Sequence, residues 1–169
     1  MKNIVIKRLF IAVLLTIAAT PAFSQVEKFK ALYVFNFAKN IGWSGSDINK
    51  DFVISVMGDE QLADELIKHS RTRTVGGRRV VVKIVNNVSD ATGSEMIYVS
   101  EKKTAAVASM VGSNSRSVII CGRRGQCSSG AHISFYLDEG RLCYEISEQN
   151  IHKAGYNCSK KMLELGRQV

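Results

Sequence analysis

The chain has 169 residues, 46% of them hydrophobic and 22% charged, and its formal net charge is +8. This length and composition are sufficient for one domain with its own hydrophobic core, and the chain after its first 24 residues has no low-complexity stretch or proline-rich linker. A positive charge of this size favours solubility and contact with anionic surfaces. It does not indicate nucleic-acid binding, so we expect no nucleic-acid partner.

The first 24 residues have the pattern of a secretory signal peptide. Three cations within the first eight residues precede an apolar run over 9–20, and small residues precede a cut predicted after Ser24. The apolar run is shorter than the roughly 20 residues that a membrane-spanning helix needs, which disfavours the alternative of an uncleaved anchor. We therefore expect an exported, periplasmic protein with a single domain over residues 25–169.

Aromatic residues at four-residue steps predict that the exported domain begins with a helix over residues 26–41. Tyr33 and Phe37 belong to this stripe, Asn36 lies within the helix, and Trp43 follows it. The segment is apolar on nearly all sides. It is therefore either deeply buried, which we favour, or part of a partner surface. The candidate residues for both interpretations are Tyr33, Asn36, Phe37 and Trp43.

The rest of the chain alternates between apolar runs and amphipathic segments. After the first helix, the expected elements are a strand over 51–57, a helix over 60–69, strands over 79–85 and 96–99, a helix over 104–110, a strand over 117–121, a hairpin with strands over 132–137 and 141–147, and a helical segment near 162–165. This order predicts an α/β fold, a mostly parallel sheet with crossover helices that ends in an antiparallel hairpin and a closing helix.

Two loops that follow predicted strands carry the candidate ligand-binding residues. Gly58 and Asp59 follow the first strand, and Arg123 and Arg124 follow the fourth. Ligands of parallel sheets bind beyond the carboxyl ends of the strands, so these loops would meet at one edge and hold a small anion or a nucleotide-like ligand. Solvated loop charges are the preferred alternative, because no phosphate-binding glycine motif accompanies the arginines.

All four cysteines lie in the last third of the chain. An even number in an exported protein predicts disulfides, and the expected pairs are Cys121–Cys127 and Cys143–Cys158. Zinc binding is disfavoured because the spacings contain no C-x-x-C half-site. The remaining alternative is that Cys121 and Cys158 are small buried hydrophobic residues.

No catalytic motif is present in the sequence. It contains no G-x-S-x-G, no H-E-x-x-H and no P-loop lysine. His69, His132 and His152 have no evident catalytic partners, and Asp59 is explained as the cap of a helix. We therefore expect no enzymatic activity, no metal and no cofactor.

Three segments resemble the YfiR-like family. Residues 30–44, KALYVFNFAKNIGWS, are similar to the family's first helix, which carries an aromatic–Asn-Phe-Ala core and ends in a tryptophan. Residues 56–66, VMGDEQLADEL, are similar to its strand-to-helix turn. Residues 130–169, GAHISFYLDEGRLCYEISEQNIHKAGYNCSKKMLELGRQV, are similar to its closing hairpin and helix.

This resemblance implies a small periplasmic protein, typically dimeric and braced by disulfides, that restrains an inner-membrane diguanylate cyclase by engaging its periplasmic sensor region. The first functional hypothesis is therefore a regulator of cyclic-di-GMP signalling with no chemistry of its own. One alternative is a module that binds a small ligand at Arg123 and Arg124. The other is a thiol-dependent enzyme or redox sensor. The resemblance is also consistent with the Cys121–Cys127 bridge.

Overall fold

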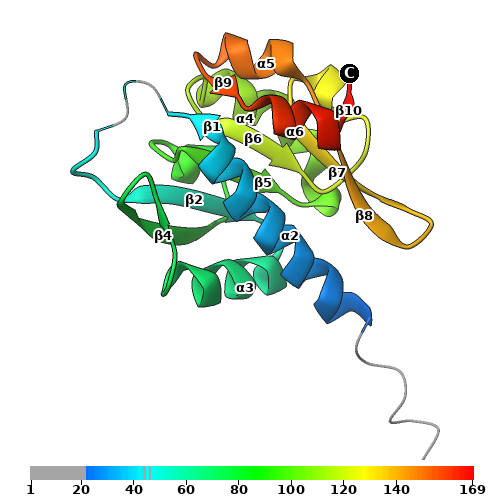
Figure 1. Ribbon diagram of the computed structural model, residues 1–169, viewed down its shortest axis with the longest axis horizontal. Coiled ribbons are helices and arrows are strands. Elements are labelled where there is room, and N and C mark those ends of the chain that lie inside the picture. Colours follow the sequence, from blue (N-terminus) through cyan, green and yellow to red (C-terminus); the bar gives the residue numbers. More distant parts are fainter. Residues whose placement is uncertain (1–21, 44, 46) are drawn as a thin grey trace, which may run out of the picture.

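The computed structural model describes residues 22–43, 45 and 47–169 (Figure 1). The predicted signal segment lies outside the described residues up to position 21, and its last three residues open the helix α2 (Ala22–Asn40). This helix therefore begins four residues earlier than the sequence predicts. None of the helices in the described ranges is long and apolar enough to cross a membrane.

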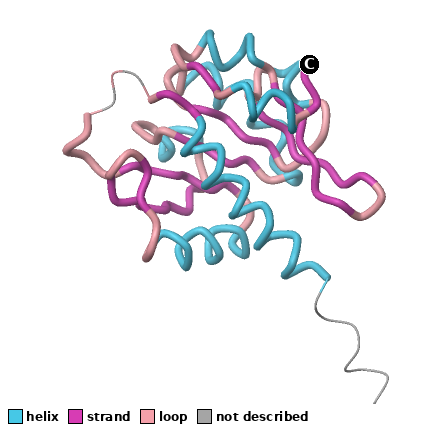
Figure 2. Tube along the Cα trace, viewed as in Figure 1, coloured by secondary structure: helices cyan, strands magenta, loops and turns pink. Residues whose placement is uncertain are grey.

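An eight-stranded sheet forms the centre of the molecule (Figure 2). Its strands, in spatial order, are β10 (Arg167–Gln168), β8 (Arg141–Ile146), β7 (Ile133–Asp138), β6 (Val118–Cys121), β5 (Met96–Val99), β2 (Phe52–Met57), β4 (Arg78–Val85) and β3 (Thr74–Val75). The neighbours from β7 to β4 pair in parallel, whereas β7 pairs with β8 in the antiparallel sense. The predicted mostly parallel α/β fold with a late antiparallel hairpin is confirmed.

Helices cover both faces of this sheet. The remaining helices are α3 (Glu60–Ser70), α4 (Val107–Ser113), α5 (Glu148–Lys153) and α6 (Lys160–Leu165), with the short 3-10 helices η1 (Val88–Ala91), η2 (Glu101–Ala106) and η3 (Gln126–Ser129). α2 and α3 lie across one face (Figure 1), and α4 packs with η1 and η3 on the other. Every residue of β5 and β6 is buried, because both faces of these central parallel strands are covered.

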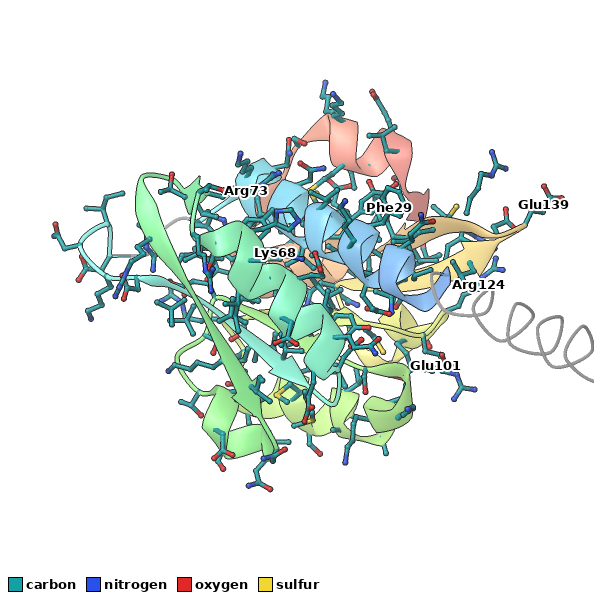
Figure 3. All side chains as sticks on the ribbon, turned by 90° about the horizontal axis from the view of Figure 1, so that it is seen from below. Phe29, Lys68, Arg73, Glu101, Arg124 and Glu139 are labelled. Carbon is teal, nitrogen blue, oxygen red and sulfur yellow. The ribbon has the colours of Figure 1, made fainter. Side chains whose placement is uncertain are left out.

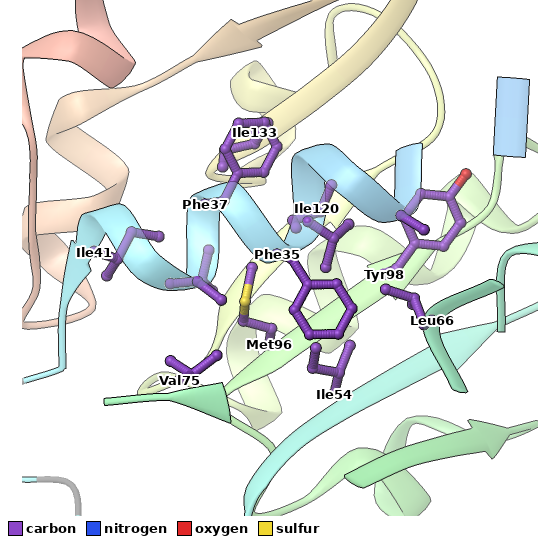
Figure 4. Close-up of a cluster of buried hydrophobic side chains, with 14 of the residues drawn as sticks. Phe35, Phe37, Ile41, Ile54, Leu66, Val75, Met96, Tyr98, Ile120 and Ile133 are labelled. Carbon is purple, nitrogen blue, oxygen red and sulfur yellow. The ribbon is translucent and has the colours of Figure 1, made fainter. Parts of the chain in front are cut away.

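The larger hydrophobic core lies between the sheet and α2. Phe35 of α2 packs over Ile54 and Met96 (Figure 4), and all three side chains are fully buried. Phe37, one of the candidate residues for a partner surface, lies in this core and stacks on Phe135. The apolar character of the first helix therefore reflects burial over most of its circumference.

The other three candidates of that group lie at different depths. Tyr33 is half-buried and packs edge-on against Phe135, while Asn36 is exposed. The indole of Trp43 packs against Phe52, and its Nε1 donates a hydrogen bond to the Ala38 carbonyl at 2.7 Å. Trp43 thus fixes the end of the helix to the core.

Several short elements are absent from the sequence-based prediction. β1 (Ile41–Gly42) and β9 (Asn157–Cys158) form a separate two-stranded sheet that joins the end of α2 to the C-terminal region. α5 is mostly polar and buries only Ile151, so hydrophobic periodicity does not reveal it. The helix expected over 104–110 is divided between η2 and α4.

Candidate functional site

The carboxyl ends of β2, β5 and β6 meet at one edge of the sheet, where a groove of about 360 Å³ opens beside the start of α2. Its lining combines cations with apolar side chains: Val26, Lys30, Glu101, Gly122, Arg123, Arg124, Phe135, Tyr136, Leu137 and Leu142. Of the four predicted ligand-loop residues, Arg123 and Arg124 therefore line the groove, and Gly58 and Asp59 do not.

Gly58 and Asp59 have structural roles at the start of α3. The Asp59 carboxylate accepts a hydrogen bond from the amide of Leu62 at 3.0 Å, which caps the helix. Gly58 has a φ of +77°, and a Cβ atom there would lie 2.6 Å from the Ser100 hydroxyl oxygen. Only glycine fits this close approach between two loops.

Lys30 connects Asp59 to the groove. Its ammonium donates hydrogen bonds to Glu27 at 2.9 Å and to the Tyr98 hydroxyl at 3.3 Å, and it lies 4.0 Å from the Asp59 carboxylate. Burial raises the pKa of Glu27, an effect that Lys30 opposes. Burial also raises the pKa of Tyr98, and the charges of Asp59 and Glu27 add to this effect. This cluster has no distinctive signal in the sequence, because Glu27 and Lys30 have the spacing of an ordinary surface pair on a helix.

Arg124 is held in place from two sides. Its Nε donates to the buried Glu145 carboxylate at 3.1 Å, and its guanidinium lies 4.5 Å from the centroid of the Tyr136 ring. The other carboxylate oxygen of Glu145 accepts a hydrogen bond from the Gly125 amide at 2.7 Å. Arg124 therefore forms a fixed wall of the groove. Arg123 is exposed, and its guanidinium makes no ion pair or hydrogen bond with any described residue.

An apolar surface borders the groove on the side of the hairpin. Leu137 and Leu142 are paired across β7 and β8 and share a sheet face with Phe135, which packs under α2. The hairpin projects from the body of the molecule (Figure 1), so Leu137 remains 56% exposed. On α2, Phe29 is 52% exposed (Figure 3). We call the set formed by Val26, Phe29, Leu137 and Leu142 the hairpin ledge.

The four cysteines are free thiols in the structure. Cys121 pairs in register with Ser134, and the Cys127 sulfur lies 3.5 Å from the Ser134 hydroxyl oxygen. The side chains of Cys121 and Cys127 therefore both lie next to Ser134, on the same face of the sheet. Their predicted bridge is not formed in the structure, and it stays a prediction.

The predicted pair Cys143–Cys158 is not formed in the structure either. Cys158 packs against the core on the α2 side of the sheet, as do Leu142 and Tyr144. Side chains alternate along a strand, so Cys143 points to the opposite face. The sheet lies between the two thiols in this structure, so its geometry does not favour this pair, which stays a prediction.

Cys121, Cys127 and the buried His132 are poorly suited to nucleophilic or acid–base chemistry at neutral pH. Burial raises the pKa of the Cys127 thiol to about 11, and it also raises the pKa of Cys121. A nucleophilic cysteine needs the opposite shift. Burial lowers the pKa of His132 to about 4, and its Nδ1 accepts a hydrogen bond from the Ile119 amide at 2.8 Å. His132 is thus a structural residue whose ring accepts a backbone hydrogen bond inside the core.

These features define a mostly parallel α/β domain with a groove at the carboxyl edge of its sheet. The chain belongs to the YfiR/HmsC-like family, whose sequence model matches residues 27–167. The resemblance found in the sequence is therefore confirmed. Members of this family are known as periplasmic regulators of diguanylate cyclases, and they are regulators rather than enzymes.

Among solved structures, the fold is similar to a conserved domain protein from Vibrio cholerae O1 biovar El Tor strain N16961, with a TM-score of 0.55 and 13% sequence identity. The similarity covers 84% of this chain and 59% of the Vibrio chain, and at this identity it supports the fold alone. A search of the curated proteins found no match.

Proposed function

We propose that this protein is a periplasmic regulator that restrains an inner-membrane diguanylate cyclase through contact with the periplasmic region of the cyclase. Membership of the YfiR/HmsC-like family supports this class of function. The observation that carries the proposal is the hairpin ledge, in which Phe29 and Leu137 each expose more than half of their surface. Apolar side chains gathered beside a charged groove are typical of a surface that a protein partner covers.

The same groove also suits the alternative of a small ligand, because its volume lies within the range of about 300–1,000 Å³ that is usual for ligand pockets. We favour the protein partner for two reasons. Phe29 lies outside the lining of the groove, and Leu137 remains exposed at its rim. A small ligand inside the groove would leave Phe29 in water, whereas a protein surface would cover both side chains.

Photo-crosslinking in the native host tests the proposal. A benzoylphenylalanine in place of Leu137 is expected to crosslink to a membrane protein that carries a diguanylate cyclase domain. The matched control is the same substitution at Ile84, which is 52% exposed on β4, far from the hairpin in the strand order. The proposal fails if position 137 captures no cyclase or if both positions capture it equally. Capture of a second copy of this chain from position 137 would make the ledge a dimer interface and would also contradict the proposal.

We also propose that the chain reaches the periplasm through cleavage after Ser24, which would leave Val26 and Phe29 near the new N-terminus. The signal-peptide pattern of the first 24 residues supports this step. Mass spectrometry of the protein from the periplasmic fraction is expected to find an N-terminal peptide that begins at Gln25. Recovery of the full-length chain from the cytoplasm alone would rule this out.

A further inference from the structure

We infer that the cyclase presents a carboxylate side chain to Arg123, flanked by aliphatic side chains that cover the hairpin ledge. This inference rests on the proposed function and adds the chemistry by which the groove recognises its partner. It follows from two observations: which charged side chains line the groove, and which of them already form ion pairs within the protein.

Three cations and one acid line the groove, and an acidic occupant would pair with whichever of these cations has no acidic partner yet. Lys30 is already bound to Glu27, and Arg124 is already bound to Glu145. Arg123 has no such partner among the described residues, and the single acid of the lining, Glu101, does not form an ion pair with it. Arg123 is therefore the cation that is free to bind a new carboxylate.

The surroundings of Arg123 would strengthen such a contact. Leu137 and Leu142 line the same groove, and a partner that covers them would exclude water from the guanidinium. An arginine–carboxylate pair gains strength as water is excluded, and its two parallel hydrogen bonds also fix the orientation of the partner. The occupant that fits is a protein segment in which an acidic residue lies between aliphatic residues.

The test uses, as its probe, the purified periplasmic region of the cyclase that crosslinks from position 137. Its dissociation constant is measured against the wild-type protein, Arg123→Glu and the control Arg71→Glu, at two salt concentrations. Arg71 is exposed at the end of α3, and its side chain forms no ion pair or hydrogen bond with any residue that the structure describes. We expect Arg123→Glu to weaken binding at least tenfold and to reduce its salt dependence, with less than a twofold effect from Arg71→Glu.

A charge exchange completes the test. The acidic residues of the probe are changed to lysine one at a time, and one of these changes is expected to restore binding to Arg123→Glu. Circular dichroism confirms that each variant is folded, and Arg123→Gln replaces Arg123→Glu if the latter is not. If the wild-type protein binds the probe and the Arg123 variants bind it equally well, the inference is wrong and the proposed function stands. If the wild-type protein does not bind the probe, both are wrong.

Discussion

Gly122 lies against the Tyr98 hydroxyl so closely that no Cβ atom fits between them. A Cβ atom at this position would also lie only 3.1 Å from the backbone nitrogen of Glu101, so it would be crowded even if the buried Tyr98 ring shifted. Gly122→Ala is therefore expected to lower the free energy of unfolding by about 1–3 kcal/mol, the usual cost of overpacking. Chemical denaturation measures the change. The control is Gly112→Ala in α4, where a Cβ atom meets nothing within 4 Å, and it should leave stability unchanged or raise it.

Lys30 is expected to contribute more stability at neutral pH than in acid. Lys30→Met leaves the half-buried Glu27 carboxylate without its cation, which is expected to cost roughly 1–3 kcal/mol at pH 7. The pKa of Glu27 is raised in the folded protein, so protonation at low pH removes the charge that needs Lys30. Denaturation of both proteins at pH 7 and pH 4 should show a smaller difference in acid. An equal loss at the two pH values would argue against this role.

His132 is expected to make the folded protein sensitive to acid. Its pKa falls from an ordinary 6.5 to about 4 on folding, so the unfolded chain binds the proton more readily between these values. Stability should therefore decrease as the pH falls from 6.5 to 4, by about 3 kcal/mol from this residue. His132→Gln should flatten this part of the stability profile. The exposed His152, changed to Gln, serves as the control and should leave the profile as it is.

Oxidation of the protein is expected to join Cys121 to Cys127 and to leave Cys143 and Cys158 unpaired with each other. The first two thiols lie beside Ser134 on one face of the sheet, whereas the sheet separates the other two. Peptide mapping without reductant identifies the bridges directly. Closing this short loop would stabilise the protein by about 2 kcal/mol, which the variant Cys127→Ser should lose. A Cys143–Cys158 peptide would contradict the placement of these residues.

The central strands could be predicted from the sequence because their environment is uniform. β5 and β6 are buried along their whole length, so each is a continuous apolar run. α3 was predictable for a different reason: Asp59 caps it and its apolar residues form one stripe. Local pattern and tertiary structure agree in these elements, and the expected bounds lie within one residue of the observed ones.

The candidate site was predictable only in part. Arg123 and Arg124 could be placed at the carboxyl edge because a parallel sheet brings its strand ends together there. The contributions of Lys30 and Leu137 depend on how α2 and the hairpin pack, and neither residue has a local signal that distinguishes it from an ordinary surface residue. Similarly, the pairing of β1 with β9 joins residues more than a hundred positions apart, and two-residue strands have no detectable periodicity.

The outer edge of β4 affects whether the protein aggregates at high concentration. β3 pairs only with Arg78 and Arg79 at the start of β4. The part of β4 beyond this pairing carries Lys83 next to the exposed Ile84. A lysine on an open strand edge discourages another chain from adding a strand, because pairing would bury its charge. The purified protein should therefore stay dispersed at high concentration. Replacing Lys83 with valine would leave a continuous β-branched edge that recruits further copies into fibres.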